Sequence, residues 1–173
     1  MDQETAGESR YLPLLPAFLF SARMPAAVYV LLAALLAIVG HMVLGAGVAL
    51  LLPIQAGPEI AMPVGTAERL ALFFTLVVFA PVVETLLMSV PLLVLTRFTA
   101  PGVAAVASAI GWGVVHSLQA PGWGLVIWWG FLIFSIAFLH WRSRSGYWAG
   151  IAVAAAIHAL NNAMPSLALL VAS

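Results

Sequence analysis

Polar side chains of reactive types interrupt several apolar stretches of this sequence. The segment AIHALNNAMPS carries His158, Asn161 and Asn162, and two other apolar stretches carry Glu84 and His116. Burying such groups in lipid without partners is costly, so they need either one another or a water-filled cavity. Glutamate and histidine can activate water and move protons, and an asparagine amide can donate to an oxyanion. These residue types could therefore support hydrolysis if the fold brings them together.

Three of these residues lie at a similar distance from the ends of their apolar stretches. The counts run from the predicted cytoplasmic end of each stretch. Glu84 lies 13 residues from Arg97, His116 lies 15 residues from Pro101, and His158 lies 12 residues from Gly146. At about 1.5 Å per helical residue, these spacings place all three roughly 18–22 Å deep. A carboxylate and two imidazoles are thus expected to meet. Hydrogen bonding between helices by each histidine alone is the simpler alternative.

The stretch that contains HALNN predicts one polar helix face. His158 and Asn162 are four residues apart, so their side chains stack on the same side of a helix. Viewed along the helix axis, Asn161 lies about 60° from His158, on the side opposite to Asn162, and it can still face inward. Hydrogen bonding between helices is the alternative role for either asparagine. His41 lies at comparable depth without a polar neighbour one turn away, which favours pairing with another helix.

The composition identifies the class of protein. Of 173 residues, 64% are hydrophobic and only 7% are charged, whereas soluble domains have about 25% charged residues. The chain is therefore an integral membrane protein whose main partner is the lipid bilayer. Its net charge of zero gives no electrostatic case for binding nucleic acid. It has no cysteine, which excludes disulfides, thiolate metal sites and cysteine nucleophiles.

Apolar stretches predict about five spans of an all-α, polytopic transmembrane helical bundle. Proline and glycine clusters separate these spans. The predicted spans are residues 26–52, 69–95, 103–118, 124–141 and 147 to about 164. The last span ends at Pro165, where we expect a kink.

Three parts of different composition follow from this division. Residues 1–10 are acidic and polar, which predicts a disordered tail. The part from 11 to 65 begins with an apolar segment broken by three prolines, which we expect at the membrane interface. It continues through the first span and most of a polar loop, residues 53–68. Residues 66–173 form a helical core that carries most of the polar residues described above.

All six basic residues are arginines, and they predict the orientation of the chain. If the N-terminus is inside, one arginine lies outside and five lie on cytoplasmic segments, namely Arg10, Arg23, Arg97, Arg142 and Arg144. Because cytoplasmic segments are enriched in basic residues, this pattern predicts an N-terminus inside and a C-terminus outside. An alanine- and arginine-rich chain of this size is typical of a bacterial cytoplasmic membrane protein.

Three short motifs lie on successive predicted spans of the helical core. APVVETLLMS carries Glu84, WGVVH carries Trp112 and His116, and HALNN carries His158 and Asn162. They resemble the motifs EExxxR, FxxxH and HxxxN of the CPBP intramembrane proteases. This family includes the CAAX prenyl proteases and the bacteriocin-processing or self-immunity proteins of the ABI type. The resemblance covers the core and implies that the glutamate, the two histidines and Asn162 form a catalytic quartet.

The first motif departs from the family pattern at two positions. Thr85 stands where the second glutamate is expected, and Ser89 stands where the arginine is expected. In the family, this pair of charges looks like support for the first glutamate. Here both charges are absent together, so neither is left unpaired in the membrane. A catalytically inactive CPBP-like scaffold, or a self-immunity protein that binds a partner, is therefore the alternative to a protease.

The resemblance implies an intramembrane endopeptidase that hydrolyses a peptide bond. Glu84 and His116 would activate and hold the water, and His158 and Asn162 would donate to the oxyanion. The customary name of metalloprotease leaves open a divalent metal such as zinc on Glu84, His116 and His158. Asparagine is a poor zinc ligand and the sequence has no HExxH motif, which favours a glutamate-activated water without metal.

The expected substrate is a peptide or a membrane protein. Eukaryotic CAAX relatives act on prenylated proteins, which are not expected in a bacterium. No oligomeric state follows from the sequence. A small transporter that relays protons through Glu84 and the histidines is a further alternative. The outer thirds of the spans offer no further ionisable groups to complete such a path.

Overall fold

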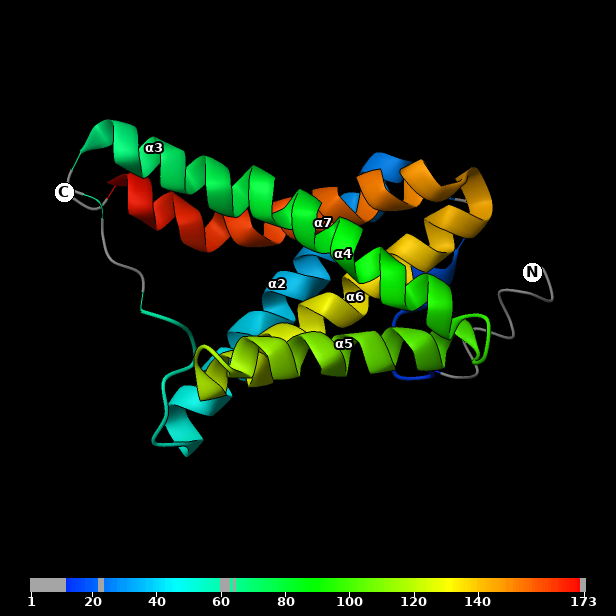
Figure 1. Cartoon of the computed structure of the whole chain (residues 1–173), viewed down its shortest axis with the longest axis horizontal. Coiled ribbons are helices and arrows are strands. Elements are labelled where there is room, and N and C mark those ends of the chain that lie inside the picture. The colour runs from blue at the N-terminus through cyan, green and yellow to red at the C-terminus, as the bar shows by residue number, and fades with distance from the viewer. Residues whose placement is uncertain (1–11, 22–23, 60–62, 64, 172–173) are drawn as a thin grey trace.

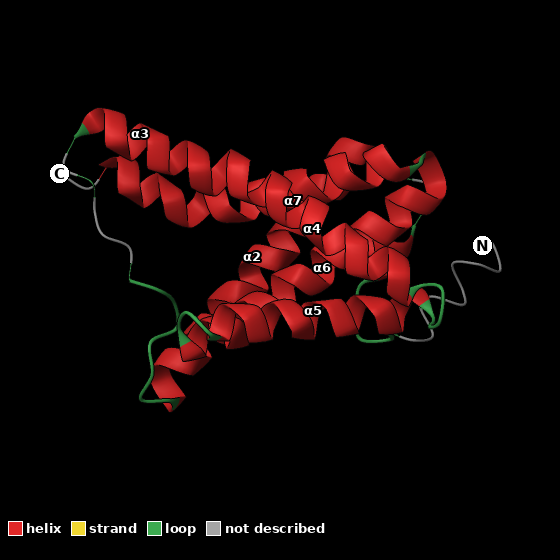
Figure 2. Ribbon diagram, in the orientation of Figure 1, coloured by secondary structure: helices red, strands yellow, loops and turns green. Residues whose placement is uncertain are grey.

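The computed structural model describes residues 12–21, 24–59, 63 and 65–171, so the predicted tail 1–10 lies outside the described residues. The described chain forms helices and turns without any strand (Figure 2), which confirms the predicted all-α class. The elements in chain order are the 3₁₀ turn η1 (Ala17–Phe20), α2 (Ala26–Leu51), α3 (Thr66–Phe74), the π-helical turn η2 (Thr75–Phe79), α4 (Ala80–Leu95), α5 (Pro101–Ser117), α6 (Pro121–Ser145) and α7 (Tyr147–Val171).

Within the described chain, three helices are long and apolar enough to cross a membrane. They are α2, the continuous helix Thr66–Leu95 that joins α3, η2 and α4, and α6. Each has at least 25 residues, so each exceeds the hydrocarbon thickness of about 30 Å. α5 packs on α6, and α7 packs on both α6 and α4. The chain is therefore a helical membrane bundle.

The helix boundaries differ from the predicted spans mainly at prolines and loop ends. α5 and α6 begin at Pro101 and Pro121, because the fixed φ and missing N–H of proline suit the first helical turn. α3 begins at Thr66, inside the stretch predicted as a loop. α7 continues through Pro165 instead of ending there. α3 packs along α7, which supports this continuation (Figure 1).

α6 lies at the centre of the bundle (Figure 1), and α2, α4, α5 and α7 all contact it. Every residue from 131 to 141 is buried. A helix that is hydrophobic on all sides cannot face water, and here the neighbouring helices cover it. The hydroxyl of Ser135 on α6 lies 3.2 Å from that of Ser108 on α5 and 3.3 Å from the sulfur of Met88 on α4. These polar contacts fix α4, α5 and α6 relative to one another.

Glycines allow the helices around α6 to approach closely. A Cβ atom on Gly124 of α6 would overlap the carbonyl oxygen of Gly113 and the hydroxyl of Ser117, both on α5. A Cβ atom on Gly150 of α7 would lie 2.7 Å from the carbonyl oxygen of Phe138 on α6. In a bilayer, helices associate through such close packing because lipid is as apolar as their side chains.

The N-terminal segment packs against the bundle at one end. Leu19 and Phe20 in η1 are buried, and the Tyr29 hydroxyl donates to the Leu19 carbonyl at 3.1 Å. The α4–α5 and α6–α7 turns lie at the same end (Figure 1), so Arg97 and Arg142 lie there too. Arg10 and Arg23 lie outside the described residues, and the orientation of the chain in the membrane stays a prediction. The position of the segment at the membrane interface stays a prediction.

Candidate active site

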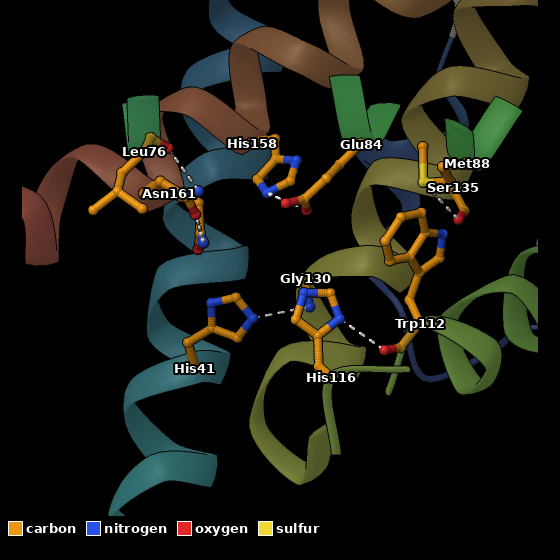
Figure 3. A network of polar contacts seen from close by, with 11 residues as sticks. His41, Leu76, Glu84, Met88, Trp112, His116, Gly130, Ser135, His158 and Asn161 are labelled. Carbon is orange, nitrogen blue, oxygen red and sulfur yellow. Dashed lines mark hydrogen bonds and ion pairs between the residues drawn. The ribbon is translucent and has the colours of Figure 1, made fainter. Parts of the chain in front are cut away.

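A cavity of about 310 Å³ lies between α2, η2, α4, α5, α6 and α7. All four residues of the predicted quartet, namely Glu84, His116, His158 and Asn162, line this cavity. Figure 3 shows the glutamate and the two histidines converging from three helices. The similar depths counted along the sequence therefore correspond to one place in the fold.

The carboxylate of Glu84 and the imidazole of His158 face each other across α4 and α7. Glu84 Oε2 lies 3.7 Å from His158 Nε2 (Figure 3). The Glu84 side chain is 27% exposed and that of His158 only 5%, so the carboxylate is the more accessible of the two. The His158 ring stacks on Phe134 with centroids 4.4 Å apart and meets the edge of Phe131 at 5.4 Å. These α6 rings orient the imidazole without occupying either of its nitrogens.

His116 is held by a hydrogen bond that determines its tautomer. Its Nδ1 lies 2.9 Å from the carbonyl oxygen of Trp112, one turn earlier on α5. Because a carbonyl can only accept, Nδ1 carries the proton, and in the neutral ring Nε2 keeps its lone pair. Figure 3 shows Nε2 turned toward Glu84 and His158. The Trp112 ring, which replaces the phenylalanine of the family motif, stacks on Phe131 at 4.6 Å.

Asn162 is fixed by the π-helical turn. The N–H of Ala80 bonds to the carbonyl of Thr75, five residues earlier. The next position is Pro81, which has no N–H, so the carbonyl of Leu76 has no helical donor. The Asn162 Nδ2 amide donates to this carbonyl at 3.0 Å. Pro81 therefore explains both the local widening of the helix and the anchoring of Asn162.

The two departures from the first family motif are both buried. The exposed fractions of Thr85 and Ser89 are 1% and 0%. Ser89 Oγ donates to the carbonyl of Leu86 at 2.7 Å, and the hydroxyl of Tyr147 on α7 lies 2.9 Å from it. Thr85 Oγ1 has no hydrogen-bond partner among the residues described. A neutral serine–tyrosine pair thus joins α4 to α7 where the family pattern has an arginine.

Replacing Tyr147 with phenylalanine is expected to lower the free energy of unfolding by about 0.5–1.5 kcal/mol. The change removes the hydroxyl that donates to Ser89 and leaves the ring packing in place. Thermal unfolding in detergent measures the effect. Trp148→Phe is the matched control, because Trp148 is 72% exposed and should tolerate the change. Equal stability of the two variants would contradict the structural role of the pair.

Two further polar residues, His41 and Asn161, line the cavity, although the sequence did not place them in the predicted quartet. His41 was expected to pair with another helix, and the Gly130 N–H of α6 does donate to its Nε2 at 3.2 Å. Its position in the cavity was not foreseen, although its depth in the first span was the available signal. Asn161 also lines the cavity, and its Nδ2 donates to Asn162 Oδ1 at 3.3 Å.

The arrangement of donor side chains determines whether the cavity can hold a metal ion. Within the described part of the chain, no group of three histidine, cysteine, aspartate or glutamate side chains is arranged to hold a metal ion. Glu84 and His158 lie close together, but His116 does not join them as a third ligand. Binding of a metal by these three residues stays a prediction.

A family model for type II CAAX prenyl endopeptidases, described as Rce1-like, matches residues 66–164. The chain belongs to the Rce1-like family. This match confirms the family that the three motifs indicated. Neither a curated protein nor a solved structure matches the chain.

The Rce1-like segment contains the whole predicted quartet. It begins at α3 and ends within α7, so α2 lies before it. His41 therefore enters the cavity from a part of the chain that the family match does not cover.

Proposed function

We propose that this Rce1-like protein is an intramembrane endopeptidase that uses a glutamate-activated water. The observation that supports it best is the pair of Glu84 and His158, 3.7 Å apart in a cavity inside a membrane bundle. A carboxylate at that position has a histidine beside it and space for a water molecule, which is the arrangement that hydrolysis needs.

In the proposed reaction, water lies between the Glu84 carboxylate and the Nε2 lone pair of His116. Glu84 takes a proton from the water as its oxygen attacks the scissile carbonyl carbon, and the carbonyl electrons move onto oxygen. When this oxyanion collapses, the C–N bond breaks and the proton on Glu84 passes to the leaving nitrogen. The products are a carboxyl group and an amine.

His158 and Asn162 are assigned to the oxyanion. His158 would donate from Nε2, which adjoins Glu84. One amide hydrogen of Asn162 is engaged by Leu76, and the second remains available for the substrate. A single donor of this kind contributes about 10²–10³-fold to the rate in other hydrolases.

The proposed setting is the cytoplasmic membrane of a bacterium with the N-terminus inside. The arginines at the end of the bundle that holds the α4–α5 and α6–α7 turns support this orientation. The substrate would be a peptide or a membrane protein whose scissile bond reaches the cavity.

The direct test compares the N-termini of membrane proteins in cells that express wild type or Glu84→Ala at matched levels. Mass spectrometry should find new N-termini with the wild type that are absent with Glu84→Ala. Such termini would identify both the activity and the substrate. Identical profiles at equal expression would overturn the endopeptidase proposal.

One observation favours a second candidate, a catalytically inactive scaffold or self-immunity protein. Neutral, buried Thr85 and Ser89 replace the two charges of the first family motif. A scaffold should tolerate loss of Glu84, so a Glu84→Ala variant that keeps the wild-type phenotype, together with identical profiles, would support this candidate.

A further inference from the structure

A second cavity, of about 200 Å³, lies between α2 and α7, beside the cavity that the quartet lines. One helical turn from each helix lines it, namely Ile38, His41 and Met42 of α2 and Asn161, Met164 and Pro165 of α7. Met42 and Met164 are 60% and 45% exposed, so the second cavity reaches the surface of the bundle at these two side chains.

This mouth of the second cavity lies at the depth of the lipid hydrocarbon. α2 is long enough to cross a membrane, and Met42 lies about 5 Å from the middle of this helix. Because the hydrocarbon layer is about 30 Å thick, an exposed side chain at this depth contacts lipid. An apolar segment within the bilayer can therefore reach the mouth, whereas a water-soluble molecule cannot. Methionine is flexible and unbranched, so both methionines can adapt to apolar side chains of different shapes.

The second cavity and the quartet cavity share one wall. His41, Asn161 and Pro165 line both cavities. The side chains of His41 and Asn161 are hydrogen-bonded to each other, so this wall joins α2 to α7. Figure 3 shows both residues beside the pair of Glu84 and His158. The wall is therefore what separates the Glu84–His158 pair from a cavity that faces lipid.

The α7 side of this wall is the side that can bend. Pro165 has no N–H, so the helical hydrogen bond to the carbonyl of Asn161 is missing. Prolines inside helices are common sites of bending. The α2 side is instead held against α6, because Trp129 Nε1 donates to the carbonyl of Leu36 at 3.0 Å and the Trp129 ring fills the space beside Gly40. Movement at the wall is therefore expected in α7, from Pro165 onward.

We propose that the gap between α2 and α7 is the entrance through which an apolar peptide segment in the bilayer reaches the quartet cavity. On entry, the hydrogen bond between His41 and Asn161 opens as α7 bends at Pro165. The segment then lies between Met42 and Met164, with its scissile bond in the quartet cavity. This entrance rests on the proposed endopeptidase function and deepens it by naming a membrane-inserted substrate. It also gives a role to α2, which precedes the residues of the family match.

The test closes the entrance with a reversible cross-link. The chain has no cysteine, so Met42→Cys/Met164→Cys supplies its only two thiols. A short bis-methanethiosulfonate should join them, and mass spectrometry verifies the bridge. In mixed micelles, the bridge is expected to slow cleavage of the membrane protein identified by its new N-terminus at least about tenfold, because entry becomes the slow step. A reductant should restore the rate.

A short water-soluble peptide with the same cleavage site is the reference substrate. The quartet cavity is also lined by Ala56 and Gly57 of the loop before α3, so this peptide has a second route. The bridge should leave its cleavage unchanged. The matched control variant is Ile110→Cys/Leu125→Cys, in the exposed groove between α5 and α6. The same bridge in that groove should leave the cleavage of both substrates unchanged.

Pro165→Ala tests the entrance without a cross-link. The restored N–H should stiffen α7 and lower kcat/KM for the membrane protein about 3–10-fold, with no change for the peptide. If the cysteine pair does not fold, this variant decides with the same two substrates.

Two results would overturn the entrance alone. If the bridged protein cleaves the membrane protein at the unbridged rate, the second cavity only holds a lipid acyl chain. If both substrates are slowed equally, the bridge acts on the site itself and not on entry. No cleavage of either substrate by the wild type would instead overturn the proposed function together with the entrance.

Discussion

Replacing Glu84 with glutamine is expected to slow peptide-bond cleavage by about 10²–10⁴-fold, because the amide cannot take a proton from water. Glutamine has nearly the same volume, so the cavity and the ring packing of His158 should persist. The effect should appear in kcat, since the proton transfer belongs to the chemical step. Single-turnover cleavage in detergent or in vesicles, with the peptide found by the comparison of N-termini, measures it.

The matched control for this prediction is Glu59→Gln. Glu59 is exposed in the loop before α3, and its Oε1 accepts a hydrogen bond from Gln55 Nε2 at 3.0 Å. This variant should cleave at the wild-type rate. If Glu84→Gln retains more than about a tenth of the wild-type rate, which is well above the loss expected for a general base, Glu84 is not the base.

Replacing Gly124 with alanine is expected to lower the free energy of unfolding by about 1–3 kcal/mol, the usual effect of overpacking. The new Cβ would overlap the Gly113 carbonyl and the Ser117 hydroxyl, so α5 and α6 would have to move apart. The Gly113 carbonyl belongs to the helix backbone, so it cannot rotate away from the new Cβ as a flexible side chain could. Since His116 follows Gly113 by less than one turn, activity should fall together with stability. Thermal unfolding in detergent and cleavage by the folded fraction measure the two effects.

Gly111→Ala is the control for this substitution. A Cβ on Gly111, in the same helix α5, meets no atom within 4 Å. Alanine is the better helix former, so this variant should be as stable as the wild type or slightly more stable. If both alanine variants unfold at the same temperature, the close approach of α5 and α6 does not limit stability.

The sequence predicted the class of fold and the meeting of the quartet residues for one physical reason. Polar groups in lipid must find one another, so depth along the helices was enough to bring Glu84, His116 and His158 together. The composition likewise required a helical bundle, because only helices or closed barrels satisfy their backbone within lipid.

The sequence did not predict the features that depend on contacts between distant segments. The position of His41 depends on Gly130 in another helix, which no local pattern shows. The anchoring of Asn162 depends on a carbonyl freed by Pro81, whereas residues 69–95 were predicted as one span without a π-helical turn. Pro165 was expected to mark the end of a helix, yet α7 continues past it with α3 packed alongside.

Because of the π-helical turn, the geometry of the helix Thr66–Leu95 depends more on the number of its residues than on their types. The turn over Thr75–Phe79 holds one residue more than regular α-helical winding would, and α4 follows it directly, with Glu84 as its fifth residue. Removing one residue there would rotate α3 by about 100° relative to Glu84 and shift it by about 1.5 Å. The contact with Asn162 uses a backbone oxygen, so it is indifferent to the side chain at position 76. The segment should therefore accept exchanges of one apolar residue for another but no change in length.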